Sequence, residues 1–472
     1  MENILSSERF VTVEPIEKGW SGDKKYCVVD AIGTKYLLRI TPIERYEARK
    51  SLYAMLEQVA ELGIPMCTPV EFGVCPDGVY SLQTWIDGDD LKETLASLPE
   101  TEQYVLGLQS GKILNKMHSI SAPNEQEEWS SQFNLKIDNK IHEYLNCGIK
   151  FDGDDHVLEY IENNRGLLEN RPQCFQHGDY HVGNMMLEYG ELRIIDFDRH
   201  SFGDPWEEFN RIVFCAQVSP HFATGQLHGY FDGEPPFEFF KLLALYSAVN
   251  MLASITWAIQ FGKNDIDFML KLSQDNLKWY DNMQNPIPTW YLKNYEVWDI
   301  YDVNGNKTGR YHERGKPVAT GDYHIVVYVW KYNSKGEWLI DKRTERYGRG
   351  NFDNKWETTG GCAIVGDDSL AAALRETKEE LGIDLDPQKG MLYKRTPRIG
   401  KDGHTWFEDV WVFEYDEPIE SVAYDGSEVC DAMWATVEKI REMVKAGEFV
   451  TEYTGSVLYP YFDEMVEKYR LK

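Results

Sequence analysis

Residues 177–198 read HGDYHVGNMMLEYGELRIIDFD, and this stretch decides the interpretation of the first half of the chain. It places Asp179 five residues before Asn184, in the order H-x-D-x-x-x-x-N, and a short apolar strand predicted over 192–195 then delivers Asp196. Phosphoryl transfer needs a carboxylate near the attacking hydroxyl, with an amide and a second carboxylate to hold metal ions on the nucleotide phosphates. The spacing therefore predicts that Asp179 orients or deprotonates a hydroxyl, while Asn184 and Asp196 bind Mg²⁺ through oxygen.

Two other interpretations of this stretch are open. A polar loop can precede a strand that happens to end in Asp, and because single carboxylates on loops are common, only the combined spacing favours a kinase site. A zinc site formed by His177, Asp179 and His181 is the second alternative. A catalytic zinc needs further ligands, and a zinc site leaves Asn184 and Asp196 unexplained.

The same segment resembles the catalytic and metal loops of the aminoglycoside phosphotransferase family, small-molecule kinases with a protein-kinase-like fold. The resemblance implies that Asp179 is the catalytic base, that Asn184 and Asp196 are metal ligands and that Asp198 is a further acidic position near the metal. HGD stands where protein kinases have HRD, which is typical of the small-molecule branch. The resemblance also implies ATP or GTP as phosphate donor, together with Mg²⁺ or Mn²⁺.

Strands predicted over 11–17, 26–31 and 35–40 precede a helix predicted over 45–62. By the resemblance, the third strand should offer a cation to the nucleotide phosphates, and Arg39 stands at that position. An arginine binds phosphate in a forked manner, although Arg39 could also be a solvent-facing strand residue. Its partner is expected on the helix, with Glu47 preferred over Glu57.

The strand predicted over 79–86 leads into the hinge between two lobes, by the same resemblance. Backbone groups around Gln83 and Trp85 would meet the nucleotide base there, so the identities of these side chains carry little information. After residues 177–198, which we call the catalytic stretch, the resemblance implies a carboxylate that anchors this stretch. Asp204 and Glu208 both fit, and the sequence does not separate them.

The composition limits the partners and the compartment. The chain has 472 residues and a formal net charge of −29, from 49 basic and 78 acidic residues, which argues against nucleic acid or an anionic membrane as a partner. Eight cysteines without a C-x-x-C pair predict reduced thiols in a cytoplasmic protein. The apolar stretch 242–259 is about as long as a membrane span, but it contains Ser, Asn and Thr, and we expect a buried helix.

A change of pattern near Pro286 and Pro288 predicts two domains. We place a kinase domain at 1–285, a linker at 286–294 and a second domain at 295–472. The second domain opens with residues that alternate as in strands, in EVWDIYD, HIVVYVWKY and EWLIDKR.

The second domain carries its own acidic constellation in residues 361–383, GCAIVGDDSLAAALRETKEELGI. Leucines form one stripe of a predicted helix that ends at Gly382, and Glu376, Glu379 and Glu380 project together from another face. Carboxylates that converge within one helical turn repel one another unless a cation joins them, so a divalent metal is the expected occupant. The alternative is a charged surface helix with ordinary ion pairs, among them Arg375 with Glu379.

This segment resembles the Nudix box, with Asp367 in place of the usual first glutamate and Thr377 in place of an aliphatic residue. The resemblance implies hydrolysis of a diphosphate linked to another moiety, with Glu379 and Glu380 as principal metal ligands and Glu376 as ligand or general base. Many members take a further acid from a distant loop. The candidates are Glu408, Asp409 and Glu428, which remain unranked.

The sequence therefore predicts an α+β protein-kinase-like bilobal domain followed by an α/β/α Nudix domain. The expected protein is a cytoplasmic bifunctional enzyme that phosphorylates the hydroxyl of an amino sugar, antibiotic or metabolite and hydrolyses a diphosphate. Its expected partners are small-molecule substrates. The alternative is a nucleotide-binding sensor in which one or both domains have lost catalysis.

Overall fold

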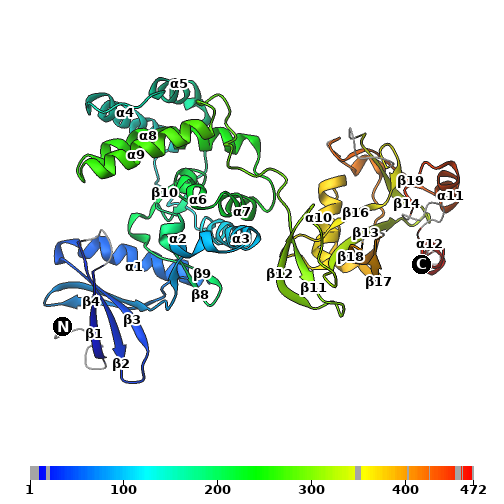
Figure 1. The fold of residues 1–472 in the computed structure, drawn as a ribbon, viewed down its shortest axis with the longest axis horizontal. Coiled ribbons are helices and arrows are strands. Elements are labelled where there is room, and N and C mark those ends of the chain that lie inside the picture. The colour runs from blue at the N-terminus through cyan, green and yellow to red at the C-terminus, as the bar shows by residue number, and fades with distance from the viewer. Residues whose placement is uncertain are drawn as a thin grey trace. The chain divides into compact units, whose positions relative to one another are not determined.

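The structure is a computed structural model that describes residues 10–17, 22–345, 352–400, 403–424, 426–451, 459 and 461–469. The chain divides into two compact units, Met1–Asn294 and Tyr295–Lys472 (Figure 1).

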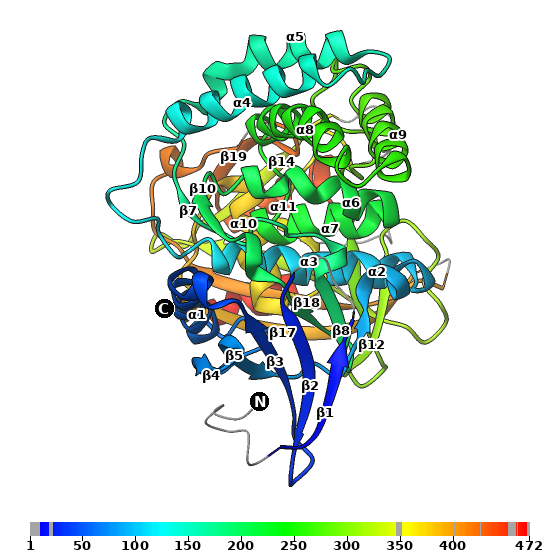
Figure 2. The same ribbon diagram turned by 90° about the vertical axis from the view of Figure 1, so that its left-hand side faces the viewer.

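The first unit begins with a five-stranded antiparallel sheet of order β1-β2-β3-β5-β4 (Figure 2). Its strands are β1 (Phe10–Ile16), β2 (Lys24–Asp30), β3 (Lys35–Thr41), β4 (Pro69–Cys75) and β5 (Gly78–Thr84). The predictions for the first three strands are confirmed to within two residues at each end. The following helix α1 (Tyr46–Glu61) buries Leu52, Leu56 and Val59, which are spaced by four and three residues and so share one face. The sheet register sets Arg39 opposite Ser81 and Leu37 opposite Gln83.

The rest of this unit is mainly helical. The helices are α2 (Leu91–Thr94), α3 (Glu100–Met117), α4 (Trp129–Asn146), α5 (Asp154–Asn164), α6 (Ile212–Val218), α7 (Pro220–Phe231), α8 (Phe237–Ala258) and α9 (Lys263–Trp279). Two small sheets carry the catalytic stretch, one of order β6-β8-β9 and one pairing β10 with β7. Their strands are β6 (Asp89–Asp90), β7 (Cys174–Gln176), β8 (Met185–Glu188), β9 (Glu191–Ile194) and β10 (Ser201–Gly203).

Helices α3 and α7 cross with almost no side chain between them. Glycines line both sides of the crossing: Gly107 and Gly111 on α3, and Gly225 and Gly229 on α7. A Cβ atom added at Gly229 would lie 2.1 Å from the backbone oxygen of Leu108, closer than any real side chain lies. The crossing also fixes the catalytic stretch, because the Tyr180 hydroxyl donates to the backbone oxygen of Ser110 on α3 at 2.8 Å.

Helix α8 contains the apolar stretch singled out in the sequence. It is long and apolar enough to cross a membrane by length and composition alone, but most of that apolar window is buried inside the protein, as predicted. Its residues form a core with α4 and α5, in which Phe133, Val157 and Leu252 are buried together.

The segment predicted as a linker packs with the first unit. Trp290 and Tyr291 are buried in the core that α3 and α7 share, and the Tyr291 hydroxyl lies 2.9 Å from Nε2 of His228. The two prolines do interrupt the helical pattern, but the aromatic residues after them have apolar surface to bury. The boundary between the compact units therefore falls after Asn294, and the segment 286–294 belongs to the first unit.

The second unit is built on a seven-stranded sheet with the path β15-β14-β13-β18-β17, where β16 pairs with β13 and β19 with β14. A separate pair joins β11 and β12. The strands are β11 (Val297–Tyr301), β12 (Lys307–Glu313), β13 (His324–Tyr332), β14 (Trp338–Arg343), β15 (Trp356–Glu357), β16 (Thr359–Cys362), β17 (Gly390–Ile399), β18 (Thr405–Glu414) and β19 (Val429–Ala435). The helices are α10 (Ser369–Leu381), α11 (Val437–Ala446) and α12 (Phe462–Tyr469).

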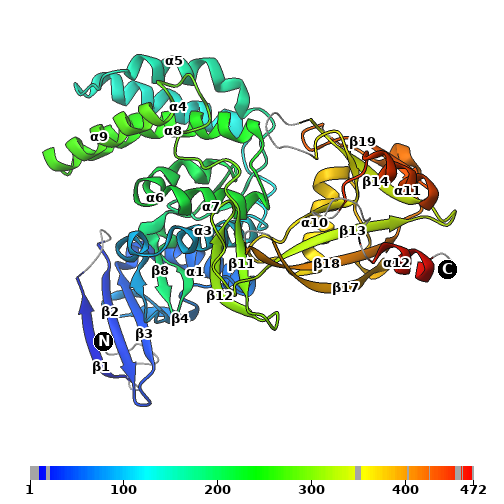
Figure 3. The same ribbon diagram turned by 45° about the vertical axis from the view of Figure 1, so that its right-hand side comes forward.

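Helices cover both faces of this sheet (Figure 3). Val327 and Val329 of β13 are buried with Ala372 and Ala373 of α10. Trp330, the next residue of β13, is buried in a second core with residues of α11 and α12. Side chains alternate between the faces of a strand, so this strand contributes to both cores. The predicted α/β/α architecture is confirmed, and Lys331 falls on the α10 side.

Candidate active sites

The catalytic stretch of the first unit is fixed from behind by buried polar contacts. His177 is fully buried, and its Nε2 lies 3.0 Å from the backbone oxygen of Ile195. The backbone N–H of Gly178 donates to Glu208 Oε1 at 2.9 Å. Asp204 instead accepts from Arg171 and from the Tyr246 hydroxyl, at 2.7 and 2.6 Å. Of the two carboxylates that the sequence left unseparated, Glu208 is the one that contacts the catalytic stretch directly.

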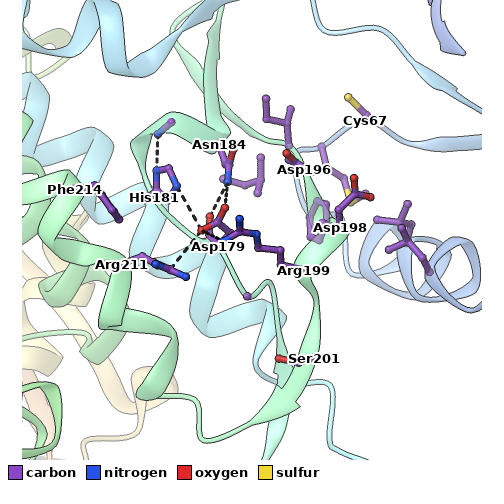
Figure 4. Close-up of a pocket in the computed structure, with 18 of the residues that line it drawn as sticks. Cys67, Asp179, His181, Asn184, Asp196, Asp198, Arg199, Ser201, Arg211 and Phe214 are labelled. Atoms are coloured by element: carbon purple, nitrogen blue, oxygen red, sulfur yellow. Dashed lines mark hydrogen bonds and ion pairs between the residues drawn. The ribbon is translucent and has the colours of Figure 1, made fainter. Parts of the chain in front are cut away.

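Asp179 is surrounded by positive and polar groups (Figure 4). Its Oδ1 lies 3.4 Å from Nε of Arg211, 3.6 Å from Nε2 of His181 and 3.8 Å from Nη1 of Arg199. Burial alone would raise the pKa of Asp179, but His181, Arg211 and Arg199 together hold that pKa well below its usual range. Asp179 is therefore ionised at neutral pH, and it is better suited to orienting a hydroxyl than to removing its proton early.

Asn184 and Asp196 lie beside Asp179. The Asn184 amide donates to the Asp179 backbone oxygen at 2.9 Å and to Oδ2 at 3.2 Å. The backbone N–H of Ile195 donates to the backbone oxygen of Asn184 at 3.0 Å, which brings the end of β9 next to Asn184. Within the described part of the chain, the exposed Asp196 carboxylate has no hydrogen-bond or ion-pair partner. Asn184 and Asp196 thus offer the oxygen ligands that Mg²⁺ prefers.

The zinc alternative does not fit this geometry. The His177 imidazole is buried behind the loop and bonded to a backbone carbonyl, whereas His181 faces Asp179. His177, Asp179 and His181 do not form a metal-binding group among the described residues.

Arg39 and Asp198 form an ion pair at the end of the site where the sequence predicts the nucleotide, with Nη1 2.5 Å from Oδ2. Arg49 of α1 binds the same carboxylate at 2.6 Å and also binds Asp23. Burial would raise the pKa of Asp198, but Arg39 and Arg49 lower it. Asp198 therefore serves as counter-ion to two arginines here, where the sequence suggested an acid near the metal.

The expected partner of Arg39 was Glu47, and the structure places a different residue there. Glu47 is exposed and Arg49 is buried, because residues two apart lie on roughly opposite sides of a helix. Glu57 is also exposed. The face of α1 that meets Arg39 thus carries a second cation.

A single cavity of about 1360 Å³ joins these residues. Its lining includes the predicted residues Asp179, Asn184, Asp196, Asp198, Arg39, Gln83 and Trp85. Glu47 does not line it. The structure therefore gathers the predicted catalytic, metal and nucleotide positions in one place, with Arg49 and Lys25 as cations that the sequence did not single out.

In the second unit, Gly361 makes room for Glu376. A Cβ atom at Gly361 would lie 2.2 Å from the carboxyl carbon of Glu376, so a side chain there would displace the carboxylate. Helix α10 ends at Gly382, whose φ of 68° is in the left-handed region that favours glycine. The two glycines of the motif thus have separate tasks, one to create space and one to end the helix.

Arg375 binds three acidic side chains of the motif. Its guanidinium donates to Asp367 at 3.1 Å, to Glu376 at 3.0 Å, to Glu379 at 2.9 Å and to the Cys362 backbone oxygen at 2.9 Å. The predicted pair with Glu379 is confirmed. Asp367 is shorter than the usual glutamate, yet it still reaches the arginine.

Glu380 lies deeper, above a buried group of charges. Lys331 Nζ donates to the Thr359 hydroxyl at 2.5 Å, and that hydroxyl donates to Asp341 at 2.8 Å. Burial, followed by the nearby Asp341 and Glu376, raises the pKa of Glu380 well above its ordinary value. Among the described residues, Glu380 Oε2 and Asp341 Oδ1 are buried without a hydrogen-bond partner. Orphaned carboxylate oxygens of this kind fit a divalent cation.

Of the three candidates for a further acid, Glu428 lies nearest the helix acids. It lines a small cavity with Glu380 and Glu357. Glu408 and Asp409 are paired instead with arginines of β17, at 2.9 and 2.6 Å. Sequence reasoning missed Glu357, Asp341 and Lys331, although a charged residue inside an apolar strand such as HIVVYVWKY was a usable signal.

In neither unit do the described residues bring three His, Cys, Asp or Glu side chains into a ready metal-binding group. In the second unit, Arg375 contacts one oxygen of Glu376 and one oxygen of Glu379, so the other oxygen of each carboxylate is not bonded to the arginine.

Stability of the metal-free protein should depend on pH through Glu376. Burial raises the pKa of Glu376 from 4.5 to about 7, so the folded state favours its protonated form. As pH rises from 4.5 to about 7, wild type should lose stability relative to Glu376→Gln, by up to about 3 kcal/mol. The measurement is urea unfolding of both proteins in EDTA at several pH values. A difference that stays flat across this window would contradict the prediction.

Comparison with known proteins identifies both units. Residues 12–240 match the model of the phosphotransferase enzyme family, and residues 322–453 match the NUDIX domain. An uncharacterised Nudix hydrolase of Listeria monocytogenes serovar 1/2a is 33% identical over 165 residues, 35% of this chain and 94% of that protein. Nudix hydrolase 3 of Arabidopsis thaliana is 28% identical over 159 residues, 32% of this chain and 20% of that protein. A thermostable mutant of aminoglycoside phosphotransferase APH(4)-Ia aligns at 15% identity and a TM-score of 0.43, over 57% of this chain and 94% of that one.

Proposed function

The chain belongs to the Nudix hydrolases through its second unit and to the phosphotransferase enzyme family through its first, and from this premise we propose that it is a bifunctional enzyme. The first unit would transfer the γ-phosphate of ATP or GTP to a hydroxyl of a small molecule. The second would hydrolyse a diphosphate linked to another moiety. The proposed partners are small molecules, and the proposed location is the cytoplasm.

In the proposed phosphotransfer, the acceptor hydroxyl is oriented by Asp179. The carboxylate stays ionised beside Arg199, Arg211 and His181, so it accepts a hydrogen bond from the hydroxyl and takes the proton late in the transfer. Asn184 and Asp196 would hold Mg²⁺, which supplies neutralisation of the phosphate charge. Arg39 and Arg49 would bind phosphate oxygens, and both arginines already neutralise Asp198.

In the proposed hydrolysis, the acids of α10 share two tasks. Glu379 and Glu380 would hold a divalent ion, which supplies activation of water and binding of the diphosphate. Glu376 has a pKa of about 7, raised by burial, so near neutral pH it can take a proton from a water molecule. Arg375 keeps Glu376 and Glu379 in position.

The observation that carries the first activity is the shared cavity of Asp179, Asn184, Asp196 and Arg39. The test is to measure ADP release with Mg²⁺ and a panel of hydroxyl acceptors, and phosphate release from nucleoside diphosphate compounds. Wild type, Asp179→Ala and Glu379→Ala are compared in both assays. Each substitution should abolish the activity of its own unit and spare the other. Nucleotide binding without turnover in either assay would favour a sensor instead.

A further inference from the structure

The cavity of the first unit extends beyond Asp179 along one face of α8. Asn250, Ser254 and Trp257 of this helix line it, and Phe261 follows just after the helix ends. The spacing of four and three residues places Asn250, Ser254 and Trp257 on one face of the helix. This wall lies outside the groups assigned to phosphate and metal, so it is available to the acceptor.

The wall is polar where it begins, next to Asp179. Arg211, whose Nε contacts Asp179, donates from Nη1 to the Asn250 side-chain oxygen at 3.2 Å. The Ser254 hydroxyl donates to the same oxygen at 3.4 Å. Neutral hydroxyl and amide groups therefore line the cavity next to the Asp179 carboxylate. Such groups can form hydrogen bonds with an alcohol.

Farther along, the wall becomes aromatic and is left open. Trp257, Phe261 and Phe268 line the cavity, yet 38%, 40% and 48% of their surfaces remain exposed. The rings of Trp257 and Phe261 lie 4.5 Å apart. The helix rises 1.5 Å per residue, so this surface begins about 10 Å from Asn250. A concave surface with several exposed aromatic side chains marks a place for an apolar ligand.

The charges of this wall do not suit a polycation. Apart from the charged residues of 179–199, the described charged side chains that line it from α4 to α9 are Lys136, Lys140, Glu207, Arg211 and Asp265. Lys136 and Glu207 pair at 2.9 Å, and Lys140 pairs with Glu143 at 2.8 Å. Glu207 and Asp179 are thus already paired with bases, which leaves few carboxylates on the wall to bind several ammonium groups. A site for a polyamine-like substrate needs several carboxylates without such partners.

We propose that the acceptor of the phosphotransferase unit is an alcohol with an apolar, aromatic-sized body, and not a polycationic amino sugar. This inference rests on the proposed function. Its hydroxyl would lie at Asp179, its hydrogen-bonding groups at Asn250 and Ser254, and its apolar body against Trp257 and Phe261.

Binding of aromatic probes to the full-length protein tests this inference without requiring turnover. The probes are anionic 1-anilinonaphthalene-8-sulfonate and neutral N-phenyl-1-naphthylamine, titrated by fluorescence in the presence of Mg²⁺ and ADP. We expect saturable binding of both probes. Trp257→Ala and Phe261→Ala should each weaken it about tenfold, because each substitution removes a large contact surface. The polycation kanamycin, at millimolar concentration, should displace neither probe.

A matched control comes from the same helix. Phe237, the first residue of α8, is 55% exposed and does not line the cavity, so Phe237→Ala should leave probe affinity unchanged. Absence of saturable binding, affinities that Trp257→Ala and Phe261→Ala leave unchanged, or displacement by kanamycin would overturn the inference. ADP release that is absent, or that survives Asp179→Ala, would instead overturn the proposed function, since probe binding does not depend on it.

Discussion

Replacing Asp179 with asparagine is expected to lower kcat for ATP-dependent phosphorylation by about 10³-fold, within the usual range for removal of a general acid–base group. The amide can still fill the space between Arg211 and Asn184, but it cannot accept the proton of the acceptor hydroxyl. The KM for ATP should change little, because the phosphate-binding cations Arg39 and Arg49 are untouched. The measurement is steady-state ADP release with the best acceptor of the panel.

A control substitution at another carboxylate shows whether the loss of one negative charge elsewhere in the first unit also lowers kcat. Asp152 is exposed and does not line the cavity, so Asp152→Asn should keep wild-type kcat. Thermal unfolding of both variants shows whether the first unit remains folded. A folded Asp179→Asn protein that keeps more than about a tenth of wild-type kcat would exclude this carboxylate from the reaction.

Replacing Lys331 with methionine is expected to destabilise the second unit by about 3–5 kcal/mol at neutral pH, the usual cost of leaving buried charges without their counter-charge. The lysine is fully buried, and it faces Asp341 and Glu380 beneath α10. Without it, two buried carboxylates must either stay charged without a counter-ion or take up protons. The loss of stability should therefore be small near pH 5 and grow toward pH 7, where the lysine, whose pKa burial lowers to about 8, is still protonated.

Urea unfolding of the full-length protein in EDTA measures this effect, with Lys335→Met as control. Lys335 is exposed in the turn between β13 and β14, so its substitution should change stability by less than about 0.5 kcal/mol. The double variant Lys331→Met, Asp341→Asn should recover part of the loss, since one of the two stranded charges is gone. A loss independent of pH would point to packing, and not to charge, as the role of Lys331.

Much of both candidate sites could be predicted because their residues are close in sequence. Asp179, Asn184 and Asp196 lie on one loop and the short hairpin that follows it, so their spacing alone predicts a common location. The same holds for Glu376, Glu379 and Glu380, which the helical repeat places together. The buried character of α8 was predicted because its apolar stretch contains Ser, Asn and Thr.

The remaining features depend on contacts between distant segments. The face that α1 presents to Arg39 depends on where the helix begins and how it packs. Residue spacing alone therefore could not show whether Glu47 or Arg49 lies on that face. Lys331, Asp341 and Glu357 lie on three different strands, and only the pairing of β13, β14, β15 and β16 brings them beneath Glu380. The burial of Trp290 and Tyr291 likewise depends on the core that receives them.

The glycine crossing of α3 and α7 limits where this protein could change to accept new substrates. The crossing holds Tyr180, and through it the neighbouring Asp179, by backbone proximity that no larger residue permits. The aromatic wall of α8 takes no part in that contact. Mutational libraries confined to Trp257, Phe261 and Phe268 could therefore explore new acceptors without changing Asp179 or its contacts, whereas the four glycines tolerate almost no substitution.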